Sequence, residues 1–277
     1  MTGRVEHVPQ LGGEVAIVTG GGRGVGRAVA EALARQGARV VLAARTTPEL
    51  DAAAAAIAEF GGRALALPAD VTDGDAVSRL VAESSREFGP PALLVNAAGS
   101  WNEIGPLENA DADAWWRDVE VSLKGTFLCT RAVLPAMLAA GNGRIVNVSS
   151  YAAVSPRPYV TGYASAKAAL LRLTDSLTVE LAGRGVRVFA ITPGFVRTRL
   201  VEQASSSEGG RRYHPELGER DDALSPELAG RLVVDIASGR LDSLCGRFLH
   251  VLDDTDDLLR RIDEIEREDL YVLRLRT

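Results

Sequence analysis

The sequence predicts an α/β fold: one domain in which a doubly wound parallel sheet of about seven strands is flanked by helices on both faces. Three observations lead to this prediction. Short apolar runs alternate with longer Ala- and Leu-rich segments through the first 200 residues. The runs are continuously apolar, without alternating polar residues, which is typical of strands buried on both faces. A glycine-rich turn follows the first run and leads directly into the first helical segment.

Each element follows from its own stretch of sequence. We expect strands at the apolar runs 15–18, 40–42, 64–67, 93–95, 144–148, 187–191 and 247–251. We expect helices over 26–36, 48–60, 76–88, 113–140, 163–182 and 226–238. Asp113 is the expected N-cap of the fourth and longest helix. Neither a repeat nor a linker interrupts this order, so we assign residues 1–277 to a single domain with its core over 12–252.

Two regions break the alternation of strands and helices. Residues 200–225 are rich in Ser, Gly, Glu and Arg, which predicts either a lid over a site or a disordered loop. A C-terminal extension covers residues 253–277. Within it Leu258, Ile262 and Ile265 recur at helical spacing, so we expect an amphipathic helix that packs on the domain or contacts another subunit. Leu270–Arg276 alternates like a short strand.

The composition is that of a globular protein, with 46% hydrophobic and 25% charged residues. The net charge of −6 argues against a reader of the nucleic-acid backbone, which needs a concentrated basic surface. We find no run of about 18 apolar residues and no signal-peptide stretch, so we expect a cytoplasmic protein without a membrane span. Cys129 and Cys245 fit neither a disulfide framework nor a metal site. We expect both to be reduced core thiols, and we expect no bound metal.

The glycine-rich turn after the first strand predicts a dinucleotide site. Glycines permit positive φ and let a pyrophosphate approach the backbone, and the helix that follows offers free N–H groups. A glycine-rich turn alone is a weak signal, but its place between the first strand and the first helix makes it more specific. The expected cofactor contacts in this turn are Gly20, Gly22, Arg23, Gly24, Val25 and Gly26.

The end of the second strand favours NADP over NAD. An NAD site would place an acidic residue there for the ribose hydroxyls, but the chain reads Ala43-Ala44-Arg45-Thr46. Arg23 and Arg45 would together suit a 2′-phosphate, because arginine binds phosphate through two parallel hydrogen bonds. We therefore expect NADP(H), with Arg45 and Thr46 among its contacts. The alternative is that these arginines are unrelated surface residues.

Tyr163 and Lys167 are the expected acid–base pair. Among 31 basic side chains only two, Lys124 and Lys167, are lysine. On a helix, residues four apart lie on one face. An ammonium beside a phenol favours the phenolate and lowers the tyrosine pKa from its usual ~10, which would make Tyr163 an acid or base near neutral pH. An exposed aromatic–cation pair is the alternative.

With these features, residues of about 12–200 resemble the short-chain dehydrogenase/reductase family, which implies a Rossmann fold. Tyr163 follows Ser150 by thirteen residues, the family's spacing, which selects Ser150 over Ser149 as the catalytic serine. Further segments resemble the family's cofactor contacts. They are Asp70-Val71, Asn96-Ala97-Ala98-Gly99, Pro193-Gly194, Val196 and Thr198.

The chain also departs from the family pattern. Ser122 stands where the family often has an asparagine that supports a water in a proton relay, and Ser122 is the expected fourth catalytic member. Ala97 replaces the second asparagine of Asn-Asn-Ala-Gly, a change expected to affect packing only. Asp253-Asp254 and the helical tail replace the usual Asp-Gly-Gly near the end.

The resemblance implies an NADPH-dependent carbonyl reductase, reversible as an alcohol dehydrogenase, that acts on a small-molecule ketone or aldehyde. Ser150 would hydrogen-bond the carbonyl oxygen and Tyr163 would donate a proton to it. Lys167 would lower the tyrosine pKa and bind the nicotinamide ribose. The resemblance also implies a homotetramer or homodimer formed through the two long helices.

Other functions stay open at this point. Ser122 is the one feature that points to an NADP-binding regulatory or scaffold protein with little turnover. A dehydratase, epimerase or enoyl reductase would need a further acid or base, which Tyr213, His214 or Glu216 could supply. The substrate itself has no recognisable code.

Two residues beyond the fourth strand are expected in the substrate pocket. Ligands of doubly wound sheets bind outside the carboxyl ends of the strands. Trp101 and Asn102 follow the fourth strand closely, so we expect both to line the pocket.

Overall fold

The computed structural model describes residues 10–275 and contains a seven-stranded sheet in the order β3-β2-β1-β4-β5-β6-β7, with every neighbouring pair parallel. The strands are β1 (Val15–Thr19), β2 (Arg39–Ala44), β3 (Arg63–Pro68), β4 (Leu93–Asn96), β5 (Gly143–Val148), β6 (Val186–Thr192) and β7 (Phe248–His250). The predicted fold class and all seven predicted strands are confirmed. The strand order reverses between β1 and β4, and such a reversal opens a crevice at the carboxyl ends of the strands.

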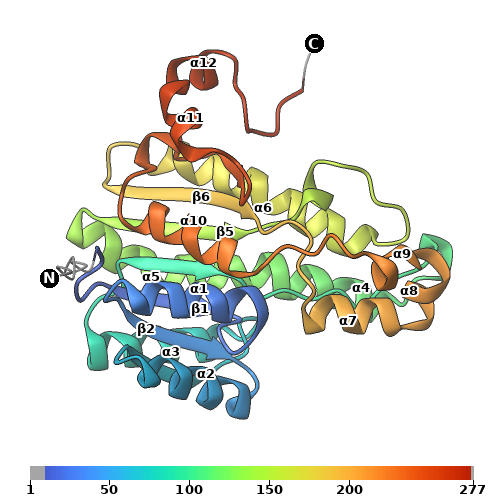
Figure 1. Ribbon diagram of the computed structural model, residues 1–277, viewed down its shortest axis with the longest axis horizontal. Helices are drawn as coiled ribbons and strands as arrows, with labels where there is room; N and C mark the ends of the chain where they lie inside the picture. Colours follow the sequence, from blue (N-terminus) through green and yellow to red (C-terminus); the bar gives the residue numbers. More distant parts are fainter. Residues whose placement is uncertain (1–9, 276–277) are drawn as a thin grey trace, which may run out of the picture.

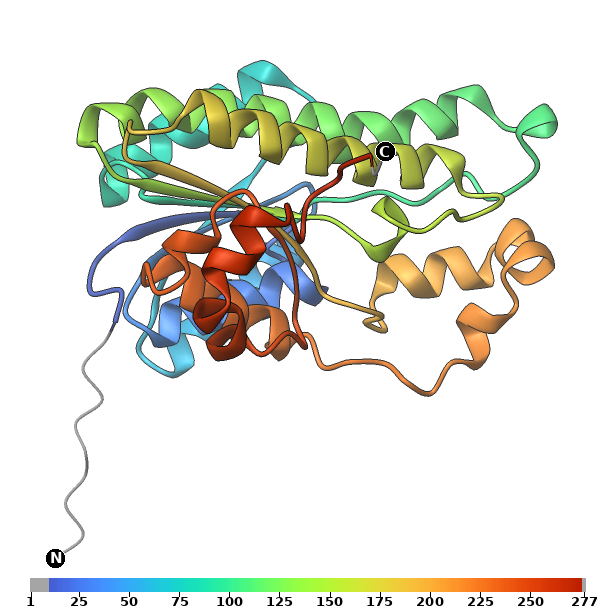
Figure 2. The same ribbon diagram turned by 90° about the horizontal axis from the view of Figure 1, so that it is seen from above.

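Helices cover both faces of the sheet (Figures 1 and 2). One core cluster joins the sheet to α1 (Gly24–Arg35), α2 (Thr47–Glu59) and α10 (Glu227–Ala237). A second cluster joins the opposite face to α3 (Gly74–Phe88) and α5 (Gly125–Ala140), beside which lies α6 (Thr161–Glu180). The short 3₁₀ turns are Leu107–Asn109, Tyr151–Ala153 and Asp242–Leu244. The central strands are buried on both faces because their side chains meet helices on each side.

The long predicted helix consists of α4 (Ala112–Val119), a π-helical turn (Glu120–Lys124) and α5. Its N-cap is Asp111 and not the predicted Asp113, because the Asp111 carboxylate accepts hydrogen bonds from the backbone N–H groups of Asp113 and Ala114. By length and composition alone this helix is apolar enough to cross a membrane. One third of its most apolar window is buried, and this part packs on the sheet, with Cys129 and Met137 in the second core cluster.

The region 200–225 is more ordered than its composition predicts. It forms α7 (Arg199–Ser206), α8 (Glu208–Tyr213) and α9 (Glu216–Glu219), which extend to one side of the sheet beside the start of α6 (Figure 2). Ser207 caps α8, because its hydroxyl accepts a hydrogen bond from the Gly210 N–H at 2.9 Å. A Cβ on Gly210 would lie 1.9 Å from the Ala204 carbonyl oxygen, so the turn between α7 and α8 depends on a glycine. We refer to residues 199–219 as the α7–α9 segment.

The C-terminal extension forms two short helices where one was predicted. They are α11 (Thr255–Arg260) and α12 (Ile262–Arg267), and they bury Leu258 and Ile265 in the first core cluster. The predicted strand is absent over residues 270–275, where Tyr271 has a φ of 59° that interrupts an extended backbone. One strand-like hydrogen bond remains, from the Phe248 N–H to the Tyr271 carbonyl at 2.8 Å. Arg276, the last residue of that prediction, lies outside the described residues.

Candidate active site

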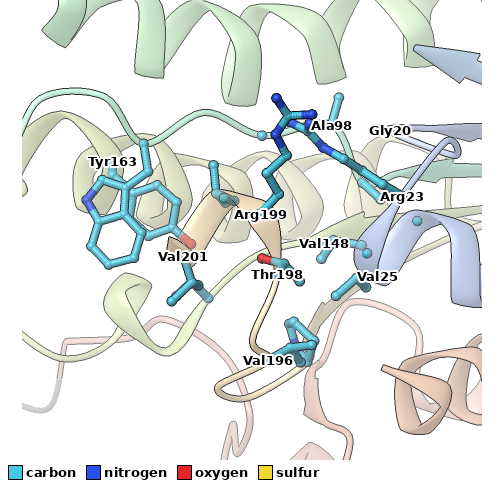
Figure 3. A pocket seen from close by; sticks show the side chains of 18 of the residues that line it. Gly20, Arg23, Val25, Ala98, Val148, Tyr163, Val196, Thr198, Arg199 and Val201 are labelled. Atoms are coloured by element: carbon cyan, nitrogen blue, oxygen red, sulfur yellow. The ribbon is translucent and has the colours of Figure 1, made fainter. Parts of the chain in front are cut away.

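A pocket of about 500 Å³ lies at the carboxyl ends of the strands, where the sequence placed the site (Figure 3). The structure brings almost all of the predicted site residues to its wall, although they come from distant parts of the chain. The predicted residues that line it are Gly20, Gly22, Arg23, Gly24, Val25, Gly26, Arg45, Thr46, Asp70, Val71, Ala97, Ala98, Gly99, Ser150, Tyr163, Lys167, Pro193, Gly194, Val196 and Thr198. Within residues 10–275, no group of three metal-ligating side chains lies close together.

The glycine turn forms a cradle that fits a pyrophosphate. Gly20 has a φ of +67°, and a Cβ there would lie 2.9 Å from the Ala97 carbonyl oxygen. A Cβ on Gly26 would lie 2.3 Å from the carbonyl oxygen of Gly20. The Thr19 hydroxyl accepts hydrogen bonds from the N–H groups of Ala97 and Ala98, both at 3.1 Å. The ends of β1 and β4 are thereby fixed at either side of the open N-terminus of α1, which is a site of positive potential.

The outer end of the pocket is rich in arginine and also holds one carboxylate. Arg45 is exposed at the end of β2, as the sequence indicated. The Oε1 atom of Glu49 accepts hydrogen bonds from Arg23 at 3.1 Å and from Arg199 at 2.9 Å. Figure 3 shows the guanidinium groups of the two arginines side by side. Sequence reasoning missed Glu49 and Arg199, because 150 residues separate the partners. These exposed pairs contribute little stability but concentrate positive charge where an anion would enter.

The paired serines after β5 have different surroundings. The Ser149 hydroxyl is buried and donates to the Lys167 backbone carbonyl at 2.9 Å. The Ser150 side chain is half-buried, and its oxygen accepts from the Ala152 N–H at 3.2 Å. Ser149 therefore joins β5 to α6, while the Ser150 hydroxyl hydrogen can turn toward the pocket. This geometry favours the serine that the spacing selects.

Lys167 reaches the pocket from within the protein. Its side chain is 5% exposed, and Nζ donates to the Val148 carbonyl at 2.8 Å. The same Nζ lies 5.7 Å from the centre of the Tyr163 ring. Burial lowers the pKa of Lys167 from 10.5 to about 8. The lysine is thus a partly desolvated cation one helical turn from the tyrosine.

The predicted lowering of the Tyr163 pKa is wrong for this structure. Burial raises the pKa of Tyr163, the Ser150 hydroxyl lowers it, and the carboxylate of Asp118 raises it further. Removal of the phenol from water is the largest of these effects, because burial disfavours the charged form. Tyr163 is therefore a protonated hydroxyl at neutral pH, and it points into the pocket (Figure 3).

Two of the residues predicted for catalysis and cofactor binding, Asn96 and Ser122, do not line the pocket. Asn96 is buried in the sheet, where its amide donates to Asn147 at 2.9 Å and to Thr130 at 3.3 Å. Ser122 is fully buried in the π-helical turn, and its Oγ has no hydrogen-bond partner within the described part of the chain. The Ser122 backbone carbonyl accepts from the Thr126 hydroxyl at 2.7 Å. The pocket wall next to it is formed by Val121 instead.

The loop after β4 contains two expected residues, and only one of them lines the pocket. Trp101 lines it, with its ring stacked on Tyr163 at a centroid distance of 5.0 Å and an interplanar angle of 15°. Asn102 turns away, and its amide donates to the Ser100 hydroxyl and to Asp118. Asp118, in α4, was missed because a single aspartate within a helical run gives no signal in the sequence.

The α7–α9 segment closes one side of the pocket. His214 is 8% exposed, and its Nε2 and Nδ1 lie 2.9 Å from the Pro158 carbonyl and 2.9 Å from Glu216, respectively. Partial burial opposes the shift, but the hydrogen bond with His214 holds the pKa of Glu216 below its ordinary value. His214 and Glu216 line the pocket, whereas Tyr213 stacks on Tyr159.

Comparisons with known proteins agree with this geometry. The family model for short chain dehydrogenases matches residues 14–209. A short chain dehydrogenase of Pseudocercospora fijiensis is 44% identical over 69% of this chain and 62% of its own length. The short chain dehydrogenase mpl6 of Monascus purpureus is 37% identical over 95% of this chain and 89% of its own length.

Two solved structures have the same fold. Levodione reductase superposes with a TM-score of 0.81 at 28% identity, over 89% of this chain and 98% of its own. A putative NAD(P) dependent gluconate 5-dehydrogenase from Beutenbergia cavernae superposes with a TM-score of 0.78 at 33% identity, over 88% of this chain and 97% of its own. That structure contains NADP at low occupancy.

Proposed function

Because this chain belongs to the short chain dehydrogenase family, we propose that it is an NADPH-dependent carbonyl reductase, reversible as an alcohol dehydrogenase. The observation that carries the proposal is the meeting of Ser150, Tyr163 and Lys167 in one pocket with the glycine cradle. The proposed substrate is a small ketone or aldehyde, whose carbonyl oxygen would lie between the hydroxyl groups of Ser150 and Tyr163.

The glycine cradle and the arginines at the outer end of the pocket suit NADP(H). Gly20–Gly26 would hold the pyrophosphate, and Arg45 with Arg23 would hold the 2′-phosphate of the adenosine ribose. NADP in the Beutenbergia cavernae structure supports this choice. We expect the other predicted residues to contact the cofactor along its length, from the adenosine end to the nicotinamide end. In that order they are Thr46, the Asp70-Val71 pair, residues 97–99, and then Pro193, Gly194, Val196 and Thr198. Asn96 lies outside the pocket wall, and its proposed contribution to cofactor binding is indirect, by fixing the end of β4.

The residues of the pocket divide the acid–base work. The cofactor supplies hydride to the carbonyl carbon when it is bound. Ser150 donates a hydrogen bond to the carbonyl oxygen, and Tyr163 gives that oxygen its phenolic proton. The raised pKa of Tyr163 suits this direction, because the hydroxyl is protonated at neutral pH. Both donors are preset where negative charge develops, which is a large electrostatic contribution to catalysis.

Lys167 and Ser122 take supporting roles in this proposal. The Lys167 ammonium lies one turn from Tyr163 and would stabilise the phenolate left after proton transfer, as well as bind the nicotinamide ribose. Ser122 is the fourth member of the proposed proton relay. Its Oγ has no hydrogen-bond partner in the described part of the chain, which is consistent with a hydroxyl that holds the water of the relay.

The test is NADPH oxidation by purified protein with a broad panel of ketones and aldehydes, followed at 340 nm. We expect turnover with some members of the panel and much slower turnover with NADH. Tight NADPH binding with no turnover on the whole panel would instead support an NADP-binding regulatory or scaffold protein.

A second candidate function is a dehydratase, epimerase or enoyl reductase of the same family. It is favoured by His214 and Glu216, which add a second acid–base pair to the pocket wall. Mass spectrometry with ¹³C NMR of the product separates these reactions. A dehydratase removes water and an epimerase leaves the mass unchanged. Both reductases add 2 Da, and the ¹³C spectrum shows whether the C=O bond or the C=C bond has been reduced.

We also propose how the remaining parts of the chain contribute. Residues 200–225 act as a lid, with α7–α9 closing the substrate side. The whole chain, 1–277, functions as one dinucleotide-binding and catalytic domain.

A homotetramer or homodimer through α5 and α6 is supported by exposed Phe127 and Val179, which are 48% and 76% exposed. The free thiols of Cys129 and Cys245 are compatible with the cytoplasm. Mass photometry at nanomolar concentration tests the assembly.

A further inference from the structure

We propose that Asp118 is a positioning residue that fixes Trp101 against the ring of Tyr163 and thereby orients the proton donor. The inference rests on the proposed function, since it assigns a task to a group next to the proposed catalytic tyrosine. Asp118 itself does not line the pocket, and it acts through the loop that follows β4.

Asp118 is a fully buried carboxylate whose hydrogen bonds all come from one short loop. Its side chain is 0% exposed. Oδ1 accepts from the Ser100 hydroxyl at 2.7 Å, the Asn102 N–H at 2.9 Å and the Asn102 amide at 3.0 Å. Oδ2 accepts from the Asn102 N–H at 2.9 Å and the Glu103 N–H at 3.1 Å. We refer to residues 100–103 as the Asp118-bound loop.

No cation pairs with Asp118 among residues 10–275. Burial of an unpaired charge costs several kcal/mol unless hydrogen bonds replace water. Here they do, and bonds to a charged acceptor are stronger and more directional than neutral ones. The carboxylate therefore gives one definite conformation to a loop that has no secondary structure of its own.

Trp101 sits at the centre of the Asp118-bound loop. Its neighbours Ser100 and Asn102 are both held by the carboxylate, so the backbone of Trp101 has little freedom. The indole lies flat on Tyr163 and also packs against the cluster of Ile104, Val160 and Ala204. Ala204 belongs to α7, so the indole lies between the catalytic tyrosine and the α7–α9 segment. A shift of Trp101 would release the tyrosine ring from one face.

The charge of Asp118 affects the pKa of Tyr163, an effect that packing of uncharged groups would not have. The carboxylate raises the pKa of Tyr163, together with burial and against the effect of Ser150. The other charged or titratable groups at this end of the pocket are Lys167 from α6, Arg157 from the loop before α6, Glu216 in α9, and His214 and Arg220 on either side of α9. Replacing Asp118 by a neutral residue therefore lowers the tyrosine pKa, because phenolate no longer faces a second negative charge.

The first measurement reports the position of Trp101 without any turnover. The protein is labelled with 5-fluorotryptophan, whose three ¹⁹F signals report its three tryptophans, and the Trp101 signal is the one lost in Trp101→Phe. In Asp118→Asn we expect this signal to shift or broaden, while the signals of Trp115 and Trp116 stay within their line widths. Asp113→Asn is the matched control, because it makes the same chemical change at an exposed position of the same helix.

The second measurement is the pH dependence of alcohol oxidation, in which the phenolate is the base. For Asp118→Asn we expect kcat to fall about tenfold, since misplacement of a reacting group costs rate more than binding. The KM for NADP should change less than twofold, and the pH at which kcat is half-maximal should move to lower pH. If Asp118→Asn does not fold, Ser100→Ala removes one of the bonds to the carboxylate and should reproduce a smaller loss of kcat with the same ¹⁹F change.

The inference is overturned if the Trp101 signal does not move, or if kcat falls with no shift of the pH profile. Its failure is distinguishable from failure of the proposed function. A wild-type protein that turns over no carbonyl compound rejects the function, and the ¹⁹F spectrum still decides whether Asp118 positions Trp101 on Tyr163.

Discussion

The two ends of the pocket are constructed in different ways. The cofactor end, formed by the glycine turn and the ends of β1, β2 and β4, consists of backbone held by the sheet. The substrate end, formed by the Asp118-bound loop, Tyr163 and the α7–α9 segment, is held by side-chain contacts between residues far apart in the sequence. A site that holds a common cofactor can rely on a rigid, shared framework, whereas the end that selects a substrate can vary by exchanging side chains.

The largest effect should come from removing the phenolic proton at the substrate end. We expect Tyr163→Phe to reduce kcat by about 10²–10⁴-fold, the usual contribution of a positioned acid. NADPH affinity, measured by fluorescence titration, should change little, because the cofactor end is unaltered. Full activity in Tyr163→Phe would contradict the assigned role and leave the two ends undistinguished.

The converse change breaks the cofactor end. In Gly26→Ala the new Cβ would meet the Gly20 carbonyl oxygen at 2.3 Å, and backbone on both sides has to move. We expect a loss of about 1–3 kcal/mol in the free energy of unfolding and much weaker NADPH binding. Gly218→Ala is the control, since a Cβ there meets nothing within 4 Å. Equal stability of the two variants in urea denaturation would be the opposing result.

Lys167 lies where the two ends meet, and its burial makes stability depend on pH. The pKa of Lys167 is about 8 in the folded protein against an ordinary 10.5, so between these values the unfolded chain holds a proton that the folded chain has lost. Stability contributed by this residue therefore rises as pH increases through that window. We expect the unfolding free energy of wild type, relative to Lys167→Met, to rise by about 2 kcal/mol between pH 7 and 10. A difference independent of pH would show that the lysine is not desolvated.

Arg45 tests the cofactor end alone. We expect Arg45→Ala to weaken NADPH binding about tenfold, which corresponds to one charge-assisted hydrogen bond, and to leave NADH binding unchanged. Arg79→Ala removes the same charge from an exposed position on α3 and serves as the control. If both cofactors weakened equally, Arg45 would act through general charge and not through the 2′-phosphate.

The smallest expected effect concerns His214, at the substrate end alone. Its two ring nitrogens contact the Pro158 carbonyl and Glu216, so removing the imidazole frees the α7–α9 segment from both contacts. We expect His214→Leu to raise the substrate KM about fivefold, the effect of one hydrogen bond, with little change in kcat. Steady-state kinetics at saturating NADPH measures this, and an unchanged KM in His214→Leu would argue against it.

Sequence reasoning was accurate where a local pattern fixes the backbone. All seven strands lie where apolar runs predicted them, and the glycine turn has the close approaches that its composition indicated. It was less accurate where short-range signals compete. The N-cap of α4 is Asp111 and not the expected Asp113. The single helix predicted for the C-terminal extension is divided in two at Arg261. Residues 200–225 lack apolar periodicity yet form helices, because Gly210 and Ser207 permit tight turns.

By itself, the sequence determined the α/β fold, the family and the meeting of Tyr163 with Lys167, because helical and strand spacing are properties of neighbouring residues. Only the tertiary structure decided that Asn96 and Ser122 lie behind the pocket wall, that Asp118 holds the loop of Trp101, and that the Tyr163 pKa is raised. Burial and proximity depend on every segment that packs around a group. A pKa or a side-chain contact at large sequence separation therefore becomes defined only once the whole chain has folded.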